Sequence, residues 1–181
     1  MDFELLGRPP DAPTLDLDHR RFAYAGKFVT PRTGKAVARA SEDPRGPEIV
    51  AATAFDADRD SESTGRIRYV TVREDVRGEG VGPRLLRVTA EDLADRYEAV
   101  DIGVNNPRAY EACYKAGFVW TGAETGMAEL RMRYAPDASR SAERYRDGYT
   151  VFAGRDLPDD QRAVVTAHAS GNPPTVVDVP E

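Results

Sequence analysis

The sequence predicts an α/β (α+β) fold whose central sheet is mixed, mostly antiparallel and flanked by helices. Residues 49–55 form an apolar run with the length and composition of a strand buried on both faces. A glycine-rich turn at residues 78–82 joins a β-branched strand to a helix-forming segment. Residues 127–134 alternate between apolar and charged side chains, as an antiparallel strand with one solvated face does. One domain of this kind, with an extra C-terminal segment, accounts for the 181 residues.

The N-terminal quarter carries the weakest signals. Residues 1–13 are rich in proline and glycine, so we expect them to be irregular. Residues 15–17 alternate like the start of a strand, and residues 21–30 are ambiguous between a strand and a short helix. A strand is expected at residues 35–40. It is followed by a turn at residues 41–47, where two dipeptides contain proline.

The glycine-rich turn follows two predicted strands and precedes a helix. The strands cover residues 48–56 and 66–72, and a polar loop at residues 58–65 separates them. The helix is expected over residues 83–97, because its apolar side chains recur with helical spacing and Pro83 suits a first helical turn.

Another strand, a helix and a final pair of strands complete the predicted core. Their expected bounds are residues 99–104 for the strand, 107–116 for the helix, and 118–121 and 127–134 for the pair. We therefore place the core domain at residues 1–134.

Residues 135–181 are expected to form a C-terminal appendage. Asp147-Gly148, between two tyrosines, is typical of a hairpin turn. A helix is predicted from about Leu157 to Ala169, with Asp156 as its cap. The last ten residues contain a Pro-Pro pair and few apolar anchors, so a loose tail is expected.

Composition narrows the classes of partner. The formal net charge of −6 disfavours nucleic acid, because phosphate binding needs a surplus of lysine and arginine. One cysteine and two histidines exclude a disulfide framework and a Cys/His metal cluster, so no metal is expected. No apolar run approaches the ~18 residues that cross a bilayer, and the acidic start differs from a secretory signal. We expect a cytoplasmic protein without a membrane partner. Three lysines against twenty-two arginines fit either a high-salt cytoplasm or a GC-rich genome.

Residues 77–84 carry the main functional signal. Gly78, Gly80 and Gly82 remove the side chains that would keep a ligand from the main chain. Successive N–H groups at a helix N-terminus form a concavity for anionic oxygen, and Arg77 and Arg84 add positive charge. The glycine spacing fits neither a dinucleotide fingerprint nor a P-loop, which also needs a lysine. The prediction is a phosphate or pyrophosphate site, with a ligand-free connection as the alternative.

Arg77-Gly-Glu-Gly80-Val-Gly82, after a strand that ends Val-Thr-Val, resembles the coenzyme A motif of the GNAT family of N-acetyltransferases. Asn106-Pro-Arg-Ala followed by Tyr114-Lys-Ala-Gly-Phe is similar to the second signature of that family. The resemblance, from about residue 35 to 134, implies a GNAT-like fold with splayed central strands. Pantetheine would bind there as an extra strand. The cofactor residues it implies are Val70, Val72, Arg77, Gly78, Glu79, Gly80, Val81, Gly82, Arg84 and Asn106.

The sequence offers one candidate for a catalytic acid. Relatives place their catalytic tyrosine where this chain has Cys113, and Tyr114 follows one residue later, a rotation of about 100° on a helix. Tyr114 is the candidate acid that protonates the leaving thiolate. The alternative is that Tyr110 and Tyr114 pack on one helical stripe. Cys113 is expected to be a small buried residue.

No general base stands out in the sequence. The strand position where some relatives carry glutamate falls near Arg66, which cannot accept a proton. Four carboxylates are candidates by position only, with a solvated surface role or a water chain as the alternative: Asp56, Asp58, Glu124 and Glu129.

The resulting hypothesis is an acyl-CoA-dependent N-acetyltransferase. A small-molecule or peptide amine would attack the thioester of acetyl-CoA directly, while an N–H near Val72 polarises the carbonyl. Two alternatives stay open. One is a non-catalytic acyl-CoA-binding sensor, and the other is an interaction protein whose C-terminal appendage recruits a partner or forms a homodimer.

Overall fold

The computed structural model describes residues 1–40 and 47–179, so most of the turn predicted at 41–47 lies outside the described residues. Contacts divide the chain into two compact units, Met1–Val100 with Val179 (unit 1) and Asp101–Asp178 (unit 2). The predicted boundary at 134/135 falls inside unit 2, and the division into core and appendage stays a prediction. The fold class, α/β with a mixed, mostly antiparallel sheet and flanking helices, is confirmed.

Unit 1 contains an antiparallel ladder of four strands, in the order β1-β2-β3-β4. The elements are β1 (Asp2–Gly7), η1 (Ala25–Lys27), β2 (Gly34–Ala40), β3 (Glu48–Ala57), β4 (Thr64–Val72), η2 (Glu74–Val76) and α1 (Val81–Ala94). All the strands predicted between residues 35 and 72, and the helix after the turn, are confirmed within a few residues.

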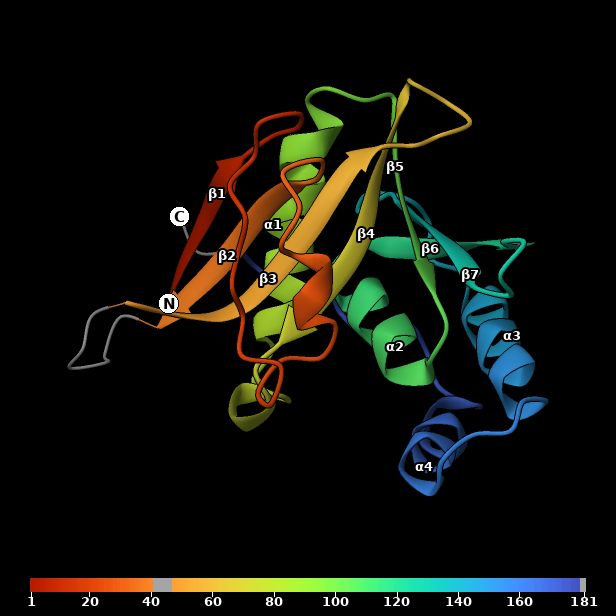
Figure 1. Cartoon of the computed structure of the whole chain (residues 1–181). Coiled ribbons are helices and arrows are strands. Elements are labelled where there is room, and N and C mark those ends of the chain that lie inside the picture. The colour runs from red at the N-terminus through yellow and green to blue at the C-terminus, as the bar shows by residue number, and fades with distance from the viewer. Residues whose placement is uncertain (41–46, 180–181) are drawn as a thin grey trace. The chain divides into compact units, whose positions relative to one another are not determined.

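Two elements cover the two faces of this ladder (Figure 1). The segment of residues 12–30, hereafter the N-terminal cover, buries Leu15, Leu17 and Phe28 against Ala52 and Ala54 of β3. On the other face lies α1, whose buried stripe includes Leu86, Ala90 and Leu93. The hydroxyls of Thr53 and Thr89, 2.9 Å apart, join β3 to α1. The two faces of β3 and β4 therefore meet different environments.

Several N-terminal expectations are wrong. Residues 2–7 form strand β1, because they find a partner in β2 despite the prolines that follow. Residues 15–17 are not a strand, since Leu15 and Leu17 are used to cover the ladder. For residues 21–30, where a strand and a short helix were both open, the structure has the short helix η1. The cover is held in place by Lys35, whose buried Nζ donates to the Thr30 carbonyl at 2.7 Å.

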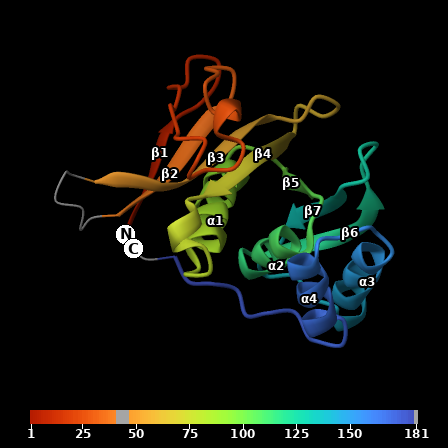
Figure 2. The ribbon, with the colours of Figure 1, turned by 60° about the horizontal axis from the view of Figure 1, so that its bottom comes forward.

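Unit 2 packs helices on an antiparallel ladder in the order β5-β7-β6. Its elements are β5 (Ala99–Val104, which begins in unit 1), α2 (Pro107–Lys115), β6 (Phe118–Glu124), β7 (Leu130–Tyr134), α3 (Ala142–Ala153) and α4 (Asp159–His168). Figure 2 shows α2, α3 and α4 lying together. Their core holds four tyrosines that are at most 1% exposed: Tyr110, Tyr114, Tyr145 and Tyr149.

The predicted hairpin at Asp147-Gly148 is wrong. Residues 142–153 form α3, whose first turn is capped by Ser141 accepting from the Arg144 N–H at 3.2 Å. A Cβ on Gly148 would lie 2.1 Å from the Tyr110 hydroxyl. The glycine thus serves close helix packing and not a turn, a use that the sequence pattern does not reveal.

The C-terminal tail is not loose over its described part. Arg140 donates to the Pro174 carbonyl at 2.5 Å, and the Val177 N–H donates to the Lys115 carbonyl at 2.8 Å. The preceding helix, α4, starts at Asp159 after Pro158, so Asp156 does not cap it. None of the helices in the described part of the chain is long and apolar enough to cross a membrane.

Candidate functional site

The turn before α1 has the backbone conformation that its glycines permit. Gly78 and Gly80 adopt φ angles of 90° and 78°, in the left-handed region that side chains disfavour. Within residues 1–40 and 47–179, the N–H groups of residues 78–82 donate to no protein acceptor. Five consecutive main-chain donors therefore lie without a protein partner at the N-terminus of a 14-residue helix. Such an array attracts anionic oxygen.

The last turn of β4 offers a second set of main-chain groups. The Arg73 N–H donates to the Val50 carbonyl of β3 at 2.9 Å. Because hydrogen-bonded residues alternate along an antiparallel pair, the main-chain groups of Val70 and Val72 point to the opposite edge of β4. This is the orientation that the predicted pantetheine contact requires.

Side chains connect the turn to β4. Arg77 is half-exposed, and its Nε donates to the Val72 carbonyl at 3.1 Å. Arg84 approaches the Glu79 carbonyl at 3.5 Å. Val81 is buried, and a Cβ on Gly82 would lie 3.1 Å from the Val72 side chain, so the start of α1 sits directly against the end of β4. Unit 1 thus brings together nine of the ten predicted cofactor residues.

Asn106, the tenth, lies in unit 2 and caps α2. Its Oδ1 accepts from the Ala109 N–H at 2.9 Å. The cap gives this residue a structural task beside any cofactor contact.

Tyr114 also lies in unit 2, and it is 1% exposed. Its hydroxyl accepts the Trp120 N–H at 3.2 Å and lies 3.5 Å from the Tyr110 hydroxyl. The rings of Tyr110 and Tyr114 contact edge to face, with centroids 5.0 Å apart. The predicted packing of the two tyrosines is confirmed, whereas the role of Tyr114 as an acid stays a prediction.

Comparison with known families decides the assignment. The model of the acetyltransferase (GNAT) family matches residues 4–118. The chain belongs to the GNAT family. A comparison with curated proteins finds no match.

Two solved structures with TM-scores of at least 0.50 share the fold of this GNAT protein. A Bacillus subtilis acetyltransferase in complex with CoA is 18% identical, with a TM-score of 0.51, and the match covers 72% of this chain and 93% of that one. The AtaT toxin bound to the C-terminus of the antitoxin AtaR is 10% identical, with a TM-score of 0.50 and coverage of 75% and 92%. Nourseothricin acetyltransferase is 19% identical, with a TM-score of 0.46, and the match covers 56% of this chain and 64% of that enzyme.

The positional candidates for a base in this GNAT protein are engaged in ion pairs or hydrogen bonds. Asp58 is 6% exposed and lies 3.0 Å from Arg66. Burial opposes its ionisation, but bonds from the Asp60 N–H and Arg66 outweigh it and hold the Asp58 pKa below its ordinary value. Asp58 is therefore a poor base, and it is not the solvated carboxylate expected as the alternative.

The other candidates have similar partners. Asp56 pairs with Arg68 at 2.5 Å, Glu124 pairs with Arg155 at 3.3 Å, and Glu129 accepts from Thr125 at 3.3 Å. Cys113 is buried as predicted, and burial raises the pKa of its thiol, so it is not a nucleophile. Among the residues that the structure describes, no group of three or more potential ligands could hold a metal ion.

Sequence reasoning missed one polar group of this GNAT protein. Thr71, between the two valines of β4, is 3% exposed, and its hydroxyl has no partner in the described chain. A threonine in a β-branched strand carries no signal that separates a functional hydroxyl from an ordinary strand former.

Proposed function

We propose that this protein binds acetyl-CoA and transfers its acetyl group to an amine. One observation carries the proposal, namely that the five N–H groups of residues 78–82, at the start of α1, have no acceptor among the described residues. A diphosphate is the ligand whose charge and several oxygens match such an array. Arg77 and Arg84 would add charge-assisted bonds to it. Membership of the GNAT family supports CoA as the source of the diphosphate.

The main chain of β4 would hold the rest of the cofactor. Val70 and Val72 present their N–H and C=O groups at the edge of β4 away from β3, where pantetheine would pair like an added strand. The Val72 carbonyl is bonded to Arg77, which leaves the Val72 N–H to polarise the thioester. The amine then attacks the carbonyl carbon directly, and acceleration comes mainly from positioning.

Replacement of Gly80 tests the diphosphate site. Gly80→Val should weaken acetyl-CoA binding at least tenfold, about 1.4 kcal/mol, because a side chain at this point blocks approach to the main chain. Gly80→Asn retains the backbone conformation of the turn, since asparagine tolerates positive φ. Its side chain should still weaken binding to a similar extent. Isothermal titration calorimetry measures both affinities.

Gly126→Val is the matched control, because open space surrounds Gly126 and its φ is not positive. This variant should bind acetyl-CoA like the parent. If the Gly80 variants are folded and retain full affinity, the diphosphate assignment is wrong. If the parent itself ignores CoA, the whole proposal fails.

The burial of Tyr114 favours a second candidate function, a non-catalytic acyl-CoA sensor. Both of its hydroxyl contacts come from unit 2 itself, so the residue is occupied in the core. Mass spectrometry after incubation with acetyl-CoA and a panel of amines separates the two functions. Acetylated product supports the transferase, whereas binding without product across the panel supports the sensor.

A further inference from the structure

The face of β4 under the N-terminal cover holds a buried hydroxyl without a partner. Thr71 is 3% exposed, and its Oγ1 bonds no group within the described ranges. Buried hydroxyls are normally paired, so one that is not calls for a ligand or another explanation. Thr71 lies between Val70 and Val72, whose main-chain groups face the edge of the same strand away from β3. The hydroxyl is therefore one residue from the place proposed for the thioester.

Strand pairing fixes which face carries this hydroxyl. Thr71 pairs with Ala52 and Tyr69 pairs with Ala54, and paired residues share a face. Ala52 and Ala54 belong to the core under the N-terminal cover, and Tyr69 packs against that core. Val72 points to the other face, where α1 is packed. Thr71 and Tyr69 thus stand side by side on the face away from α1.

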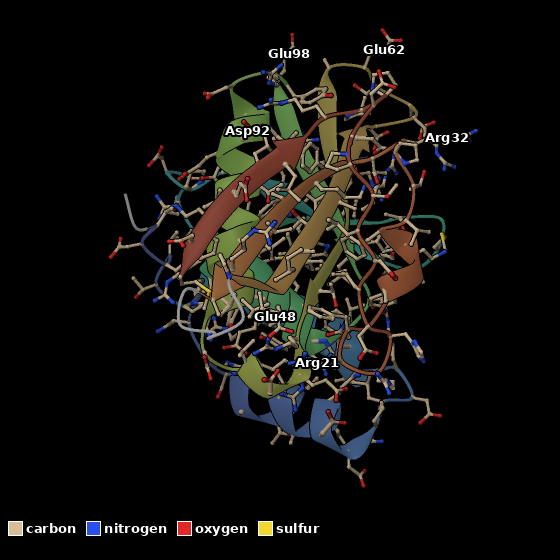
Figure 3. The ribbon with its side chains drawn as sticks, turned by 60° about the vertical axis from the view of Figure 1, so that its left-hand side comes forward. Arg21, Arg32, Glu48, Glu62, Asp92 and Glu98 are labelled. Atoms are coloured by element: carbon tan, nitrogen blue, oxygen red, sulfur yellow. The ribbon has the colours of Figure 1, made fainter. Side chains whose placement is uncertain are left out.

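An exposed aromatic side chain lies beside Tyr69. Tyr24 of the cover is 55% exposed, and its ring centroid is 6.1 Å from that of Tyr69. Its φ of 59° places a tyrosine in the left-handed region, which costs on the order of 1–2 kcal/mol. Arg21 holds this part of the cover through Glu48 of β3, at 2.7 Å (Figure 3), and through its carbonyl, which accepts the Glu74 N–H. A strained, exposed tyrosine on a fixed support indicates a contact surface.

We propose that Tyr24, Tyr69 and Thr71 form the acceptor site and that the acceptor is a primary amine on a short tether from an aromatic ring. This inference rests on the proposed function. Residues 69 and 71 are separated along the strand by about 7 Å, the reach of a ring plus a two-carbon chain. The ring packs on Tyr24 and Tyr69, and the smaller amine follows the strand edge to the Thr71 hydroxyl. Because the fold encloses that oxygen, side chains of the cover shift when the amine binds. No sequence signature marks these three residues.

Positive charge beside the ring pair of Tyr24 and Tyr69, hereafter the aromatic platform, disfavours a substrate that carries a second positive group. The Lys27 ammonium lies 5.7 Å from the centre of the Tyr69 ring. Within the described ranges it forms no ion pair with a carboxylate. A diamine would bring its second ammonium close to this uncompensated charge. The site therefore favours an aryl monoamine over an aliphatic diamine.

The same geometry gives the side from which the amine attacks. The nitrogen lone pair forms the new N–C bond from the Thr71 face, and the C–S bond breaks with its electron pair on sulfur. The amine loses one proton and the CoA thiolate takes up one, so the products are the amide and free CoA. Thr71 accepts an N–H bond from the attacking amine and orients its lone pair, which makes it a positioning residue.

Thr71→Val tests the hydroxyl without changing side-chain shape. Because that hydroxyl is unpaired, the melting temperature should stay level or rise, while kcat/KM for tyramine falls about tenfold and the acetyl-CoA affinity is unchanged. Thr53→Val is the matched control on the α1 face of the neighbouring strand. It breaks the bond to Thr89, so it should lower the melting temperature and leave KM for tyramine unchanged.

The aromatic platform is tested by substrate preference. The parent should acetylate tyramine at least tenfold better than n-butylamine or putrescine, and Tyr24→Ala should remove the advantage over n-butylamine by raising KM. Lys27→Gln should improve putrescine selectively. Preference for an aliphatic amine, or no effect of Thr71→Val and Tyr24→Ala on tyramine, overturns the inference while the transferase stands. A parent that binds acetyl-CoA but acetylates no amine also overturns it, whereas a parent that does not bind CoA refutes the proposed function.

Discussion

Tyr114 shows how one side chain can have a structural and a chemical interpretation at once. Removal of its hydroxyl leaves the Trp120 N–H without an acceptor in the core of unit 2. Tyr114→Phe should therefore lower the free energy of unfolding by about 1–3 kcal/mol. If the hydroxyl also protonates CoA thiolate, kcat should fall at least tenfold and the alkaline limb of the pH–rate profile should change.

Tyr110→Phe is the control for this prediction. The Tyr110 hydroxyl donates to the Tyr145 carbonyl at 3.1 Å, so its loss should also destabilise unit 2. It should leave the pH–rate profile unchanged. Equal kinetic effects of both variants would show that Tyr114 acts only through packing.

At the scale of elements, Asp58 makes the stability of the β3–β4 hairpin depend on pH. In the folded chain the Asp58 pKa is lowered, with burial opposing the bonds from Asp60 and Arg66 that cause the net shift. When the pKa of a carboxyl group is lower in the folded than in the unfolded chain, its charge stabilises the fold at pH values above the unfolded pKa, which is about 3.9 for aspartate. This contribution is lost as the pH falls through the folded pKa. Asp58→Asn should thus cost about 1–3 kcal/mol at pH 7 and progressively less below pH 4.

Denaturant unfolding at several pH values measures this difference. Glu124→Gln is a useful comparison, because the Glu124–Arg155 pair is half-exposed and should contribute no more than about 1 kcal/mol at any pH. A cost for Asp58→Asn that stays constant from pH 7 to pH 2.5 would contradict the assigned role of the carboxylate charge.

Elements differ in how strongly their sequence determines them. β3, β4, α1 and β5 form within a few residues of their predicted bounds, because apolar runs, helical spacing and glycine turns act locally. β1 was missed because its residues depend on hydrogen bonds to β2. The Asp-Gly pair in α3 suggests a hairpin, but glycine is needed at position 148 because Tyr110, 38 residues earlier, packs against it.

At the scale of the whole molecule, the C-terminal region contributes side chains to the core of unit 2. Tyr145, Tyr149 and Phe152 are fully buried, so deletion of residues 135–181 should unfold unit 2. Truncation after Gly171 should disturb the core less, because it spares those buried side chains; it removes the Pro174 partner of Arg140 and the Val177 partner of the Lys115 carbonyl. This truncation should keep acetyl-CoA affinity and speed amide exchange in the last turn of α2.

Hydrogen–deuterium exchange measures that local change, and calorimetry measures the affinity. Exchange in α1 provides the internal reference and should not change. If the truncated protein exchanges in α2 like the parent, the contacts of Pro174 and Val177 do not restrain the helix.

The sequence by itself determined the family, the glycine-rich turn before α1 and most strands, because glycines and apolar periodicity act over a few neighbouring residues. It also singled out Val70 and Val72, whose main-chain groups face away from β3. Only the tertiary structure decided that Thr71 is buried without a partner beside Tyr69, and that Tyr114 is enclosed by α3. Those properties arise from contacts between residues far apart in the chain, which no local pattern records.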